Sequence, residues 1–167
     1  MNINKQTILI LINKMTEKRV IIIIGKTGNG KSALANVLLN KNGEFEEIFE
    51  ENNSFKSCTR EFKSGNFEDE KRRIKYTVID TPGISDTNPE NEREVYRQIA
   101  KAVCSTGKKL NQVLFVTNNR FTSEEERAYE LLWDAFFSED ITNFTTIVRT
   151  NFPNFEDSEA CKKILRK

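Results

Sequence analysis

The sequence contains no histidine, only three cysteines and no long hydrophobic run. Without histidine, the chain lacks the side chain most often used for proton transfer near neutral pH and the commonest zinc ligand. Cys58, Cys104 and Cys161 lie far apart and show no metal-binding spacing, which favours free thiols in a reducing compartment. Any reaction must therefore rest on charge placement, a metal ion and water.

The apolar stretches are short and the charges are balanced. Residues 7–12 form an apolar run that is too short to span a bilayer or to act as a secretory signal. This run is expected to be an added edge strand or a short helix. Lys and Arg number 26 against 25 Asp and Glu, and no basic stripe interleaves with aromatics, so nothing favours a nucleic-acid partner. We expect a cytoplasmic chain with no membrane segment.

The most informative stretch is the glycine-rich segment at residues 25–32, which follows an apolar run at residues 20–24. It reads Gly-Lys-Thr-Gly-Asn-Gly-Lys-Ser and fits the pattern G-x-x-x-x-G-K-[S/T] between a strand and a helix. The glycines let the backbone turn tightly and aim N–H groups at phosphate oxygens, and the helix adds the positive end of its dipole. The segment predicts a nucleoside-triphosphate site.

The chemistry of this loop suggests individual roles. Lys31 is expected to reach the β- and γ-phosphates and to stabilise the charge that develops on them, and the Ser32 hydroxyl is expected to bind Mg²⁺. The alternative is a glycine-rich turn with a chance Lys-Ser pair, which the flanking strand and helix disfavour. The predicted nucleotide-binding residues of the loop are Gly25, Lys26, Thr27, Gly28, Asn29, Gly30, Lys31, Ser32 and Ala33.

A second motif, Asp-Thr-Pro-Gly, occupies residues 80–83 at the end of an expected strand. Asp80 would hold Mg²⁺ through a water, and the N–H of Gly83 would meet the γ-phosphate. Alone, D-x-x-G is an ordinary turn, but after a complete phosphate loop it indicates a nucleotide switch. A switch also needs a threonine that coordinates Mg²⁺ between the two motifs. Thr77 lies inside a strand, so Thr59 is the candidate, unless it is simply a solvent-facing strand residue.

Strand and helix signals alternate along the chain, which predicts an α/β domain with a mostly parallel sheet. The expected strands are residues 20–24, 58–67, 73–79, 112–117 and 145–148. The expected helices are residues 31–40, one that opens at 88–89, one that follows a doubled capping box at 122–126, and residues 157–167. Residues 44–57 are expected to form a surface loop, and Gly65-Asn66 with a charged turn are expected to separate two adjacent strands.

An aromatic series in the helix after the capping box allows two interpretations. Tyr129, Trp133 and Phe137 recur every four residues, offset from the core-facing positions of that helix. They would either widen its buried face or form an exposed ridge that docks a partner or a second copy.

Four segments together resemble one family of GTPases. The phosphate loop, residues 57–59 (Ser-Cys-Thr) and residues 80–83 look like the avirulence-induced-gene family, also called immune-associated nucleotide-binding proteins, or GIMAP in vertebrates. Residues 113–125, with their Arg-Phe-Thr-x-Glu-Glu series, are similar to a box that is particular to this family. The likeness runs from about residue 19 to residue 153, so residues 1–18 are expected to be an N-terminal extension and residues 19–167 the G domain.

The resemblance implies a septin- and Toc-related P-loop NTPase domain, a three-layer sandwich with helices on both faces of the sheet. Such a domain binds GTP or GDP with Mg²⁺, often dimerises across its nucleotide face with a second copy or a related GTPase, and hydrolyses GTP slowly unless assembled. Ser32, Thr59 and Asp80 would place the metal, and Lys31 and Thr59 would act in catalysis. The family's last strand and helix have no counterpart here, which suggests a C-terminally truncated product or a partner that covers the sheet.

The base-reading segment departs from the family pattern. A guanine reader has Asn or Thr, then Lys or Arg, any residue, and an Asp that accepts both guanine N–H groups. Thr150 or Asn151 would begin it here, and Pro153 or Asn154 then stands where the Asp belongs. Ile84 also replaces the water-positioning Gln of small GTPases, so Arg60 or Arg120 from a second subunit are bare candidates for assistance. The competing functions are a nucleotide-locked assembly module with negligible turnover and a P-loop kinase, although no arginine-rich lid is recognisable.

Overall fold

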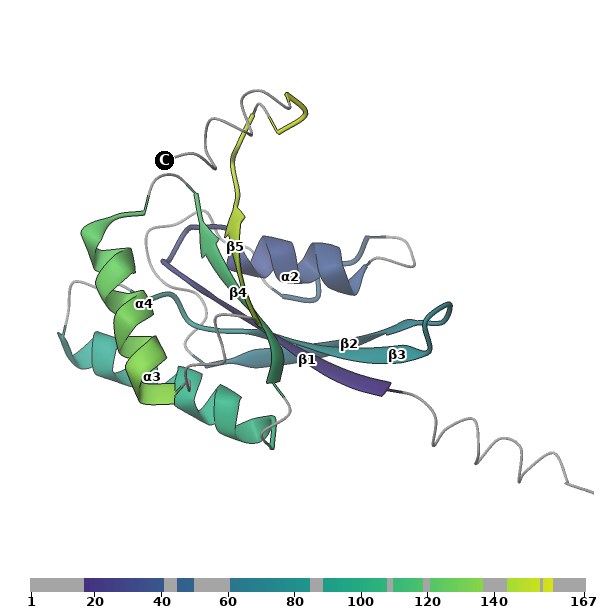
Figure 1. Cartoon of the computed structure of the whole chain (residues 1–167), viewed down its shortest axis with the longest axis horizontal. Coiled ribbons are helices and arrows are strands. Elements are labelled where there is room, and N and C mark those ends of the chain that lie inside the picture. The colour runs from purple at the N-terminus through teal and green to yellow at the C-terminus, as the bar shows by residue number, and fades with distance from the viewer. Residues whose placement is uncertain are drawn as a thin grey trace, which may run out of the picture.

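A five-stranded sheet organises the chain, with its strands in the order β2-β3-β1-β4-β5 (Figure 1). The computed structural model describes residues 17–40, 45–49, 61–84, 89–107, 110–118, 121–136, 144–153 and 155–157. The strands are β1 (Glu17–Gly25), β2 (Lys63–Asp69), β3 (Ile74–Asp80), β4 (Leu110–Thr117) and β5 (Thr145–Arg149). Neighbouring strands pair in parallel except β2 and β3, which pair antiparallel. The predicted α/β class with a mostly parallel sheet is confirmed.

Helices cover both faces of this sheet (Figure 1). Helix α2 (Lys31–Leu39) lies on one face, and α3 (Pro89–Ser105) and α4 (Ser123–Phe136) lie on the other. The isoleucine run of β1 is buried between these layers, as expected for a central parallel strand. Ile22 and Ile24 pack in the core beneath α3 and α4, whereas Ile23 packs in the core beneath α2. The predicted three-layer sandwich is therefore confirmed.

The predicted connection between the two adjacent strands holds in part. The charged turn is confirmed at residues 70–73, but Gly65 and Asn66 lie inside β2, which begins at Lys63 rather than at residue 58. A Cβ at Gly65 would lie 2.6 Å from Leu39 Cδ1 of α2. The glycine therefore lets a helix approach a strand closely, and it was mistaken for a turn signal because both uses favour a residue without a side chain.

The predicted surface loop at residues 44–57 is anchored over its described part. Phe49 is buried in the core beneath α2. Asn36 of α2 holds the backbone on both sides of this residue, since its Nδ2 donates to Phe49 O at 2.8 Å and its Oδ1 accepts from Phe49 N at 2.8 Å. Asn40 holds Glu46 in the same reciprocal manner at 2.7 Å. The rest of the predicted loop, residue 44 and residues 50–57, lies outside the described residues.

Helix α4 begins at the predicted capping box. Thr122 N donates to Glu125 Oε2 at 3.0 Å, and Glu125 N donates back to Thr122 Oγ1 at 3.3 Å. Further along, Tyr129 packs edge-on against Phe115 in the core, so the wide-core interpretation holds for this residue. Phe137 lies outside the described residues, as do the apolar run at residues 7–12 and nearly all of the helix expected from residue 157.

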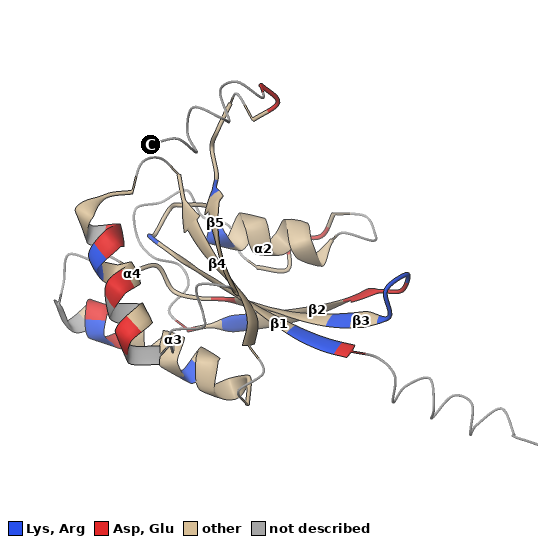
Figure 2. Cartoon of the chain, in the orientation of Figure 1, with Lys and Arg blue, Asp and Glu red and all other residues tan. Residues whose placement is uncertain are grey.

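Charged side chains of both signs lie along α3, α4 and the β2–β3 hairpin (Figure 2). One such pair is Arg97 and Glu94 on α3, whose Nε and Oε2 atoms are 2.7 Å apart. No helix in the described ranges is long and apolar enough to cross a membrane.

Candidate functional site

Four parallel strands bring the predicted motifs to one edge of the sheet. β1, β3, β4 and β5 all point the same way and end at Gly25, Asp80, Thr117 and Arg149. The glycine-rich loop, the Asp-Thr-Pro-Gly turn and the segment after β5 therefore lie side by side, at the carboxyl edge where open α/β sheets bind ligands.

The glycine-rich loop turns back on itself between β1 and α2. Gly28 and Gly30 both have φ of 81°, in the left-handed region, and Gly30 is the N-cap of α2. Asn29 N donates to Lys26 O at 3.2 Å, which closes the turn. The loop thus has the strand–turn–helix geometry in which backbone N–H groups and a helix N-terminus face an anion.

The side chains of Lys31, Ser32 and Asp80 lie near one another at this loop. Ser32 Oγ donates to Asp80 Oδ2 at 2.7 Å, and Lys31 Nζ donates to Lys26 O at 3.1 Å. Lys31 and Asp80 are buried, at 7% and 1% exposure. The second carboxylate oxygen, Asp80 Oδ1, is buried and has no hydrogen-bond partner among the residues that the structure describes. A buried acceptor left open in this way indicates a position suited to an additional cationic or donor ligand.

Burial shifts the pKa values of Lys31 and Asp80 in opposite directions. Loss of hydration lowers the pKa of Lys31 to about 8, although the nearby Asp80 carboxylate opposes this shift. Loss of hydration raises the pKa of Asp80, opposed by the Ser32 hydrogen bond and by the Lys31 charge. Both groups would regain charge stabilisation if an anion lay at Lys31 and a cation at Asp80.

The Ser32 and Asp80 oxygens fit Mg²⁺, which prefers a few protein oxygens and takes its remaining ligands from water and phosphate. Within the described ranges, no group of three or more His, Cys, Asp and Glu side chains could hold a metal by itself. The donor set therefore fits a metal shared with a phosphorylated ligand better than a closed protein site.

The Asp-Thr-Pro-Gly turn is attached to the glycine-rich loop. Ile84 N donates to Gly25 O at 3.1 Å, and Lys26 and Ile84 form a parallel bridge. A Cβ at Gly83 would lie 2.1 Å from Thr27 Oγ1 and 2.5 Å from Thr27 N, so only glycine fits this approach. Ile84 itself is buried in the core beneath α3 and α4.

Of the two candidates for the start of the base-reading segment, Thr150 and Asn151, the structure brings Thr150 to the loop. Its Oγ1 donates to Asn29 O at 2.7 Å, and its N–H donates to Thr117 O at 2.8 Å. Asn151 is exposed and has φ of 50°. The guanidinium of Arg149 lies 4.7 Å from the centre of the Phe152 ring. Counting from Thr150, Pro153 stands at the position of the missing carboxylate.

Two predicted site residues need separate comment. Thr59 lies outside the described residues, as do the arginine candidates Arg60 and Arg120. Asn29 belongs to the loop, yet its side chain turns inward: its Nδ2 donates to Val116 O at 2.9 Å and to Glu125 Oε1 at 2.8 Å. The sequence placed Glu125 in the capping box and in the box that resembles the family, but it gave no sign of the contact with the loop, because the partners are far apart in the chain.

The sheet, the loop between its central strand and α2, and the Ser32–Asp80 pair together define a P-loop NTPase fold. More particularly, the chain belongs to the AIG1 family, whose model matches residues 19–167. The resemblance to that family is therefore confirmed.

Known relatives are similar over most of this chain. It is 28% identical over 155 residues to Immune-associated nucleotide-binding protein 13 of Arabidopsis thaliana, covering 92% of this chain and 43% of that protein. It is 29% identical over 166 residues to GTPase IMAP family member 8 of Mus musculus, covering 88% of this chain and 22% of that protein. The chain thus spans less than half the length of these relatives.

Solved structures of Toc33 from Arabidopsis thaliana share the fold. The complex with GDP and Mg²⁺ aligns with a TM-score of 0.63 and 17% identity, over 83% of this chain and 52% of Toc33. The complex with Mg²⁺ and GMPPNP aligns with a TM-score of 0.61 and 18% identity over the same shares.

Proposed function

We propose that residues 19–167 form a Mg²⁺-dependent GTP-binding switch domain that hydrolyses GTP slowly. The observation that carries this proposal is the buried Asp80 carboxylate, which accepts from Ser32 through one oxygen and has no partner among the described residues at the other. The names of the relatives, which include a GTPase and nucleotide-binding proteins, support it. The solved Toc33 structures also support it, since one is a complex with GDP and Mg²⁺ and another is a complex with Mg²⁺ and GMPPNP. Because the widely spaced cysteines favour free thiols in a reducing compartment, we further propose a cytoplasmic location.

The residues of the loop would act by placing charge rather than by forming bonds. Backbone N–H groups of residues 28–32 would surround the phosphates, and the Lys31 ammonium would stabilise negative charge that grows on the β–γ bridging region. Ser32 and Asp80 would hold Mg²⁺, which when bound neutralises charge on the β- and γ-phosphates. Gly83, packed on Thr27, would sense the γ-phosphate through its N–H as the turn moves.

Slow turnover follows from Ile84. A buried aliphatic side chain neither donates nor accepts a hydrogen bond, so it does not orient an attacking water. The proposed catalytic contribution of Thr59, or of a group from a second subunit, would have to replace it. The same residue supports the second candidate function, an assembly module that binds nucleotide with negligible turnover.

Guanine preference is proposed on family grounds, because Pro153 supplies no carboxylate for the base. Thr150 would support the loop, and Asn151 would lie beside the base. Dimerisation through the nucleotide face is likewise a proposal, supported by Toc33, one solved structure of which is that of a dimerisation-deficient mutant. Light scattering with GDP and with GMPPNP would test it, since only a nucleotide-dependent dimer changes mass between the two.

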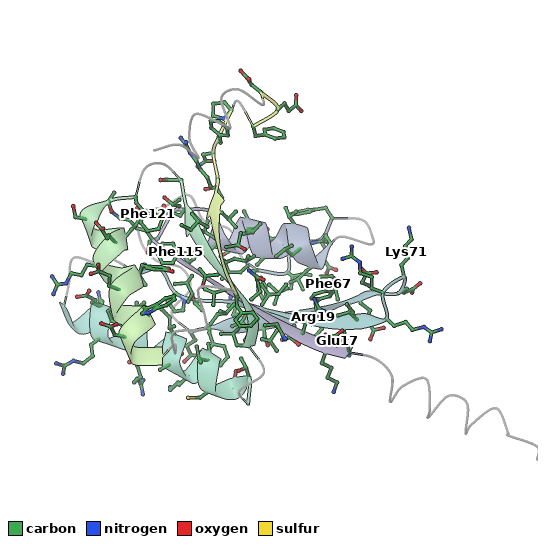
Figure 3. The ribbon with its side chains drawn as sticks, in the orientation of Figure 1. Glu17, Arg19, Phe67, Lys71, Phe115 and Phe121 are labelled. Carbon is green, nitrogen blue, oxygen red and sulfur yellow. The ribbon has the colours of Figure 1, made fainter. Side chains whose placement is uncertain are left out.

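Calorimetry with GTPγS and ATPγS, with and without Mg²⁺, tests the proposed function. We expect Mg²⁺-dependent binding that prefers GTPγS and is lost in Lys31→Ala. Lys71→Ala is the matched control, because this exposed lysine lies in the β2–β3 turn, well away from the loop (Figure 3). Equal binding of both nucleotides would reject guanine preference, and absence of binding would reject the proposal. Single-turnover release of phosphate then separates a slow GTPase from an assembly module.

A further inference from the structure

The side chain of Asn29 points into the protein interior, although its backbone belongs to the phosphate loop. It is 2% exposed, and its amide donates to Val116 O at 2.9 Å and to Glu125 Oε1 at 2.8 Å. A side-chain amide has two N–H donors, so both are used in these contacts. Asn29 therefore ties the loop to β4 and α4, and its side chain has no donor left for a phosphate.

Glu125 is the unusual partner in this contact, because it is a carboxylate with only 2% exposure. Its two oxygens have separate tasks: Oε1 accepts from Asn29, and Oε2 accepts from the N–H of Thr122. Burying a carboxylate is costly unless its oxygens are hydrogen-bonded. The position in the first turn of α4 adds a favourable interaction with the helix dipole. A helix cap alone needs only one of the two oxygens.

The start of α4 packs against β4, and this contact is the anchor for the Asn29 side chain. Phe121, just before the cap, stacks on Phe115 of β4 with ring centres 5.3 Å apart, and the two side chains lie together beside α4 (Figure 3). Val116, the next residue of β4, supplies the other acceptor for Asn29. Both acceptors therefore come from elements that are already packed against each other.

The backbone of Asn29 links this anchor to the rest of the site. Its N–H donates to Lys26 O within the loop, and its carbonyl accepts from Thr150 Oγ1 at 2.7 Å. A displacement of Asn29 would move the loop amides and the segment after β5 together. We infer that Glu125 is a positioning residue for nucleotide binding, which acts through Asn29 to hold the phosphate loop and its contact with Thr150.

This inference rests on the proposed function, and a double-mutant cycle on the full chain tests it. GTPγS affinity is measured by calorimetry for the wild type, Glu125→Ala, Asn29→Ala and the double variant. We expect Glu125→Ala to weaken binding about tenfold, as for neighbours coupled through one network. The double variant should bind no worse than Asn29→Ala. Glu126→Ala, one residue further along the same helix and exposed, is the matched control and should bind as the wild type does.

A second readout needs no nucleotide. Hydrogen exchange of the loop amides in the nucleotide-free protein should speed up in Glu125→Ala and not in Glu126→Ala. Melting temperatures check that each variant is folded, and Glu125→Gln, which keeps the length and one acceptor oxygen, replaces Glu125→Ala if the latter fails to fold.

The outcomes separate the two proposals. If the wild type does not bind GTPγS, the proposed function fails, and loop exchange still decides whether Glu125 holds the loop. If Glu125→Ala lowers the melting temperature but leaves affinity and loop exchange unchanged, Glu125 is only a helix cap and the inference is overturned. The inference would also be overturned if the losses of GTPγS affinity in the two single variants multiplied in the double variant. Glu125 would then act independently of Asn29.

Discussion

The two ends of the proposed nucleotide site are built differently. At the phosphate end, Lys31 and Asp80 are buried, and each is held by a named contact within the loop or beside it. At the base end, Thr150 makes such contacts, but Asn151 and Pro153 are exposed and no carboxylate stands at residue 153. If the chain binds nucleotide as proposed, retention of the phosphates and choice of the base should therefore be separable by mutation.

The largest expected effect concerns the burial of Lys31. Its pKa is lowered from 10.5 to about 8, so below pH 8 burial of the charged amine opposes folding. Between pH 8 and 10.5 the unfolded chain binds more protons at this group, and stability rises by about 3 kcal/mol. Urea unfolding at pH 7 and pH 10.5, without nucleotide or Mg²⁺, should show this gain in the wild type relative to Lys31→Met. An unchanged difference between the two proteins would show that Lys31 is well hydrated.

The next largest effect is expected on Mg²⁺-dependent nucleotide binding, when the oxygens proposed to hold the metal are changed. Asp80→Asn keeps an acceptor for Ser32 but removes the charge of the carboxylate with the open oxygen. We expect Mg²⁺-dependent GTPγS binding to weaken by about a hundredfold, at the upper end of losses at metal sites. Calorimetry over a series of Mg²⁺ concentrations measures it, with the exposed Glu68→Gln as control. Binding that responds to Mg²⁺ as in the wild type would place the metal elsewhere.

A smaller effect is expected on the choice of base, from a substitution that restores a carboxylate at the base end. Pro153→Asp restores a carboxylate in the register that Thr150 sets, and we expect the preference for GTPγS over ATPγS to rise about tenfold. Pro153→Ala separates the loss of the proline ring from the gain of the carboxylate. The ratio of the two affinities is the measurement. A ratio that stays the same in both variants would mean that residue 153 does not face the base.

The smallest effect concerns the contact that joins the two ends. Thr150→Val removes the hydroxyl that donates to Asn29 O while keeping the shape of the side chain. GTPγS affinity should fall about fivefold, the size of one ordinary hydrogen bond. Thr146→Val, within β5 and exposed, removes a hydroxyl that accepts from Gln112 Nε2 rather than one that contacts the loop, and should bind as the wild type does. Similar losses in both variants would point to a general weakening of β5 instead.

Most of the fold and the phosphate end could be predicted because their signals are local. The isoleucine run, the glycine-rich loop and the acid at the tip of β3 each carry their meaning within a few neighbouring residues. Gly65 shows the limit, because the need for a glycine there is explained by Leu39, which lies far away in the sequence. The inward turn of Asn29 was out of reach for the same reason, because its partners belong to β4 and α4.

The contact between Gly83 and Thr27 has a consequence for how the family can vary. These two positions share one volume, in which even a methyl group on residue 83 would overlap the neighbouring chain. Their evolutionary histories should therefore be tied together. Among relatives with this loop arrangement, we expect position 83 to stay glycine. A relative with a side chain at position 83 should have a smaller residue at position 27 or a larger separation between the two segments.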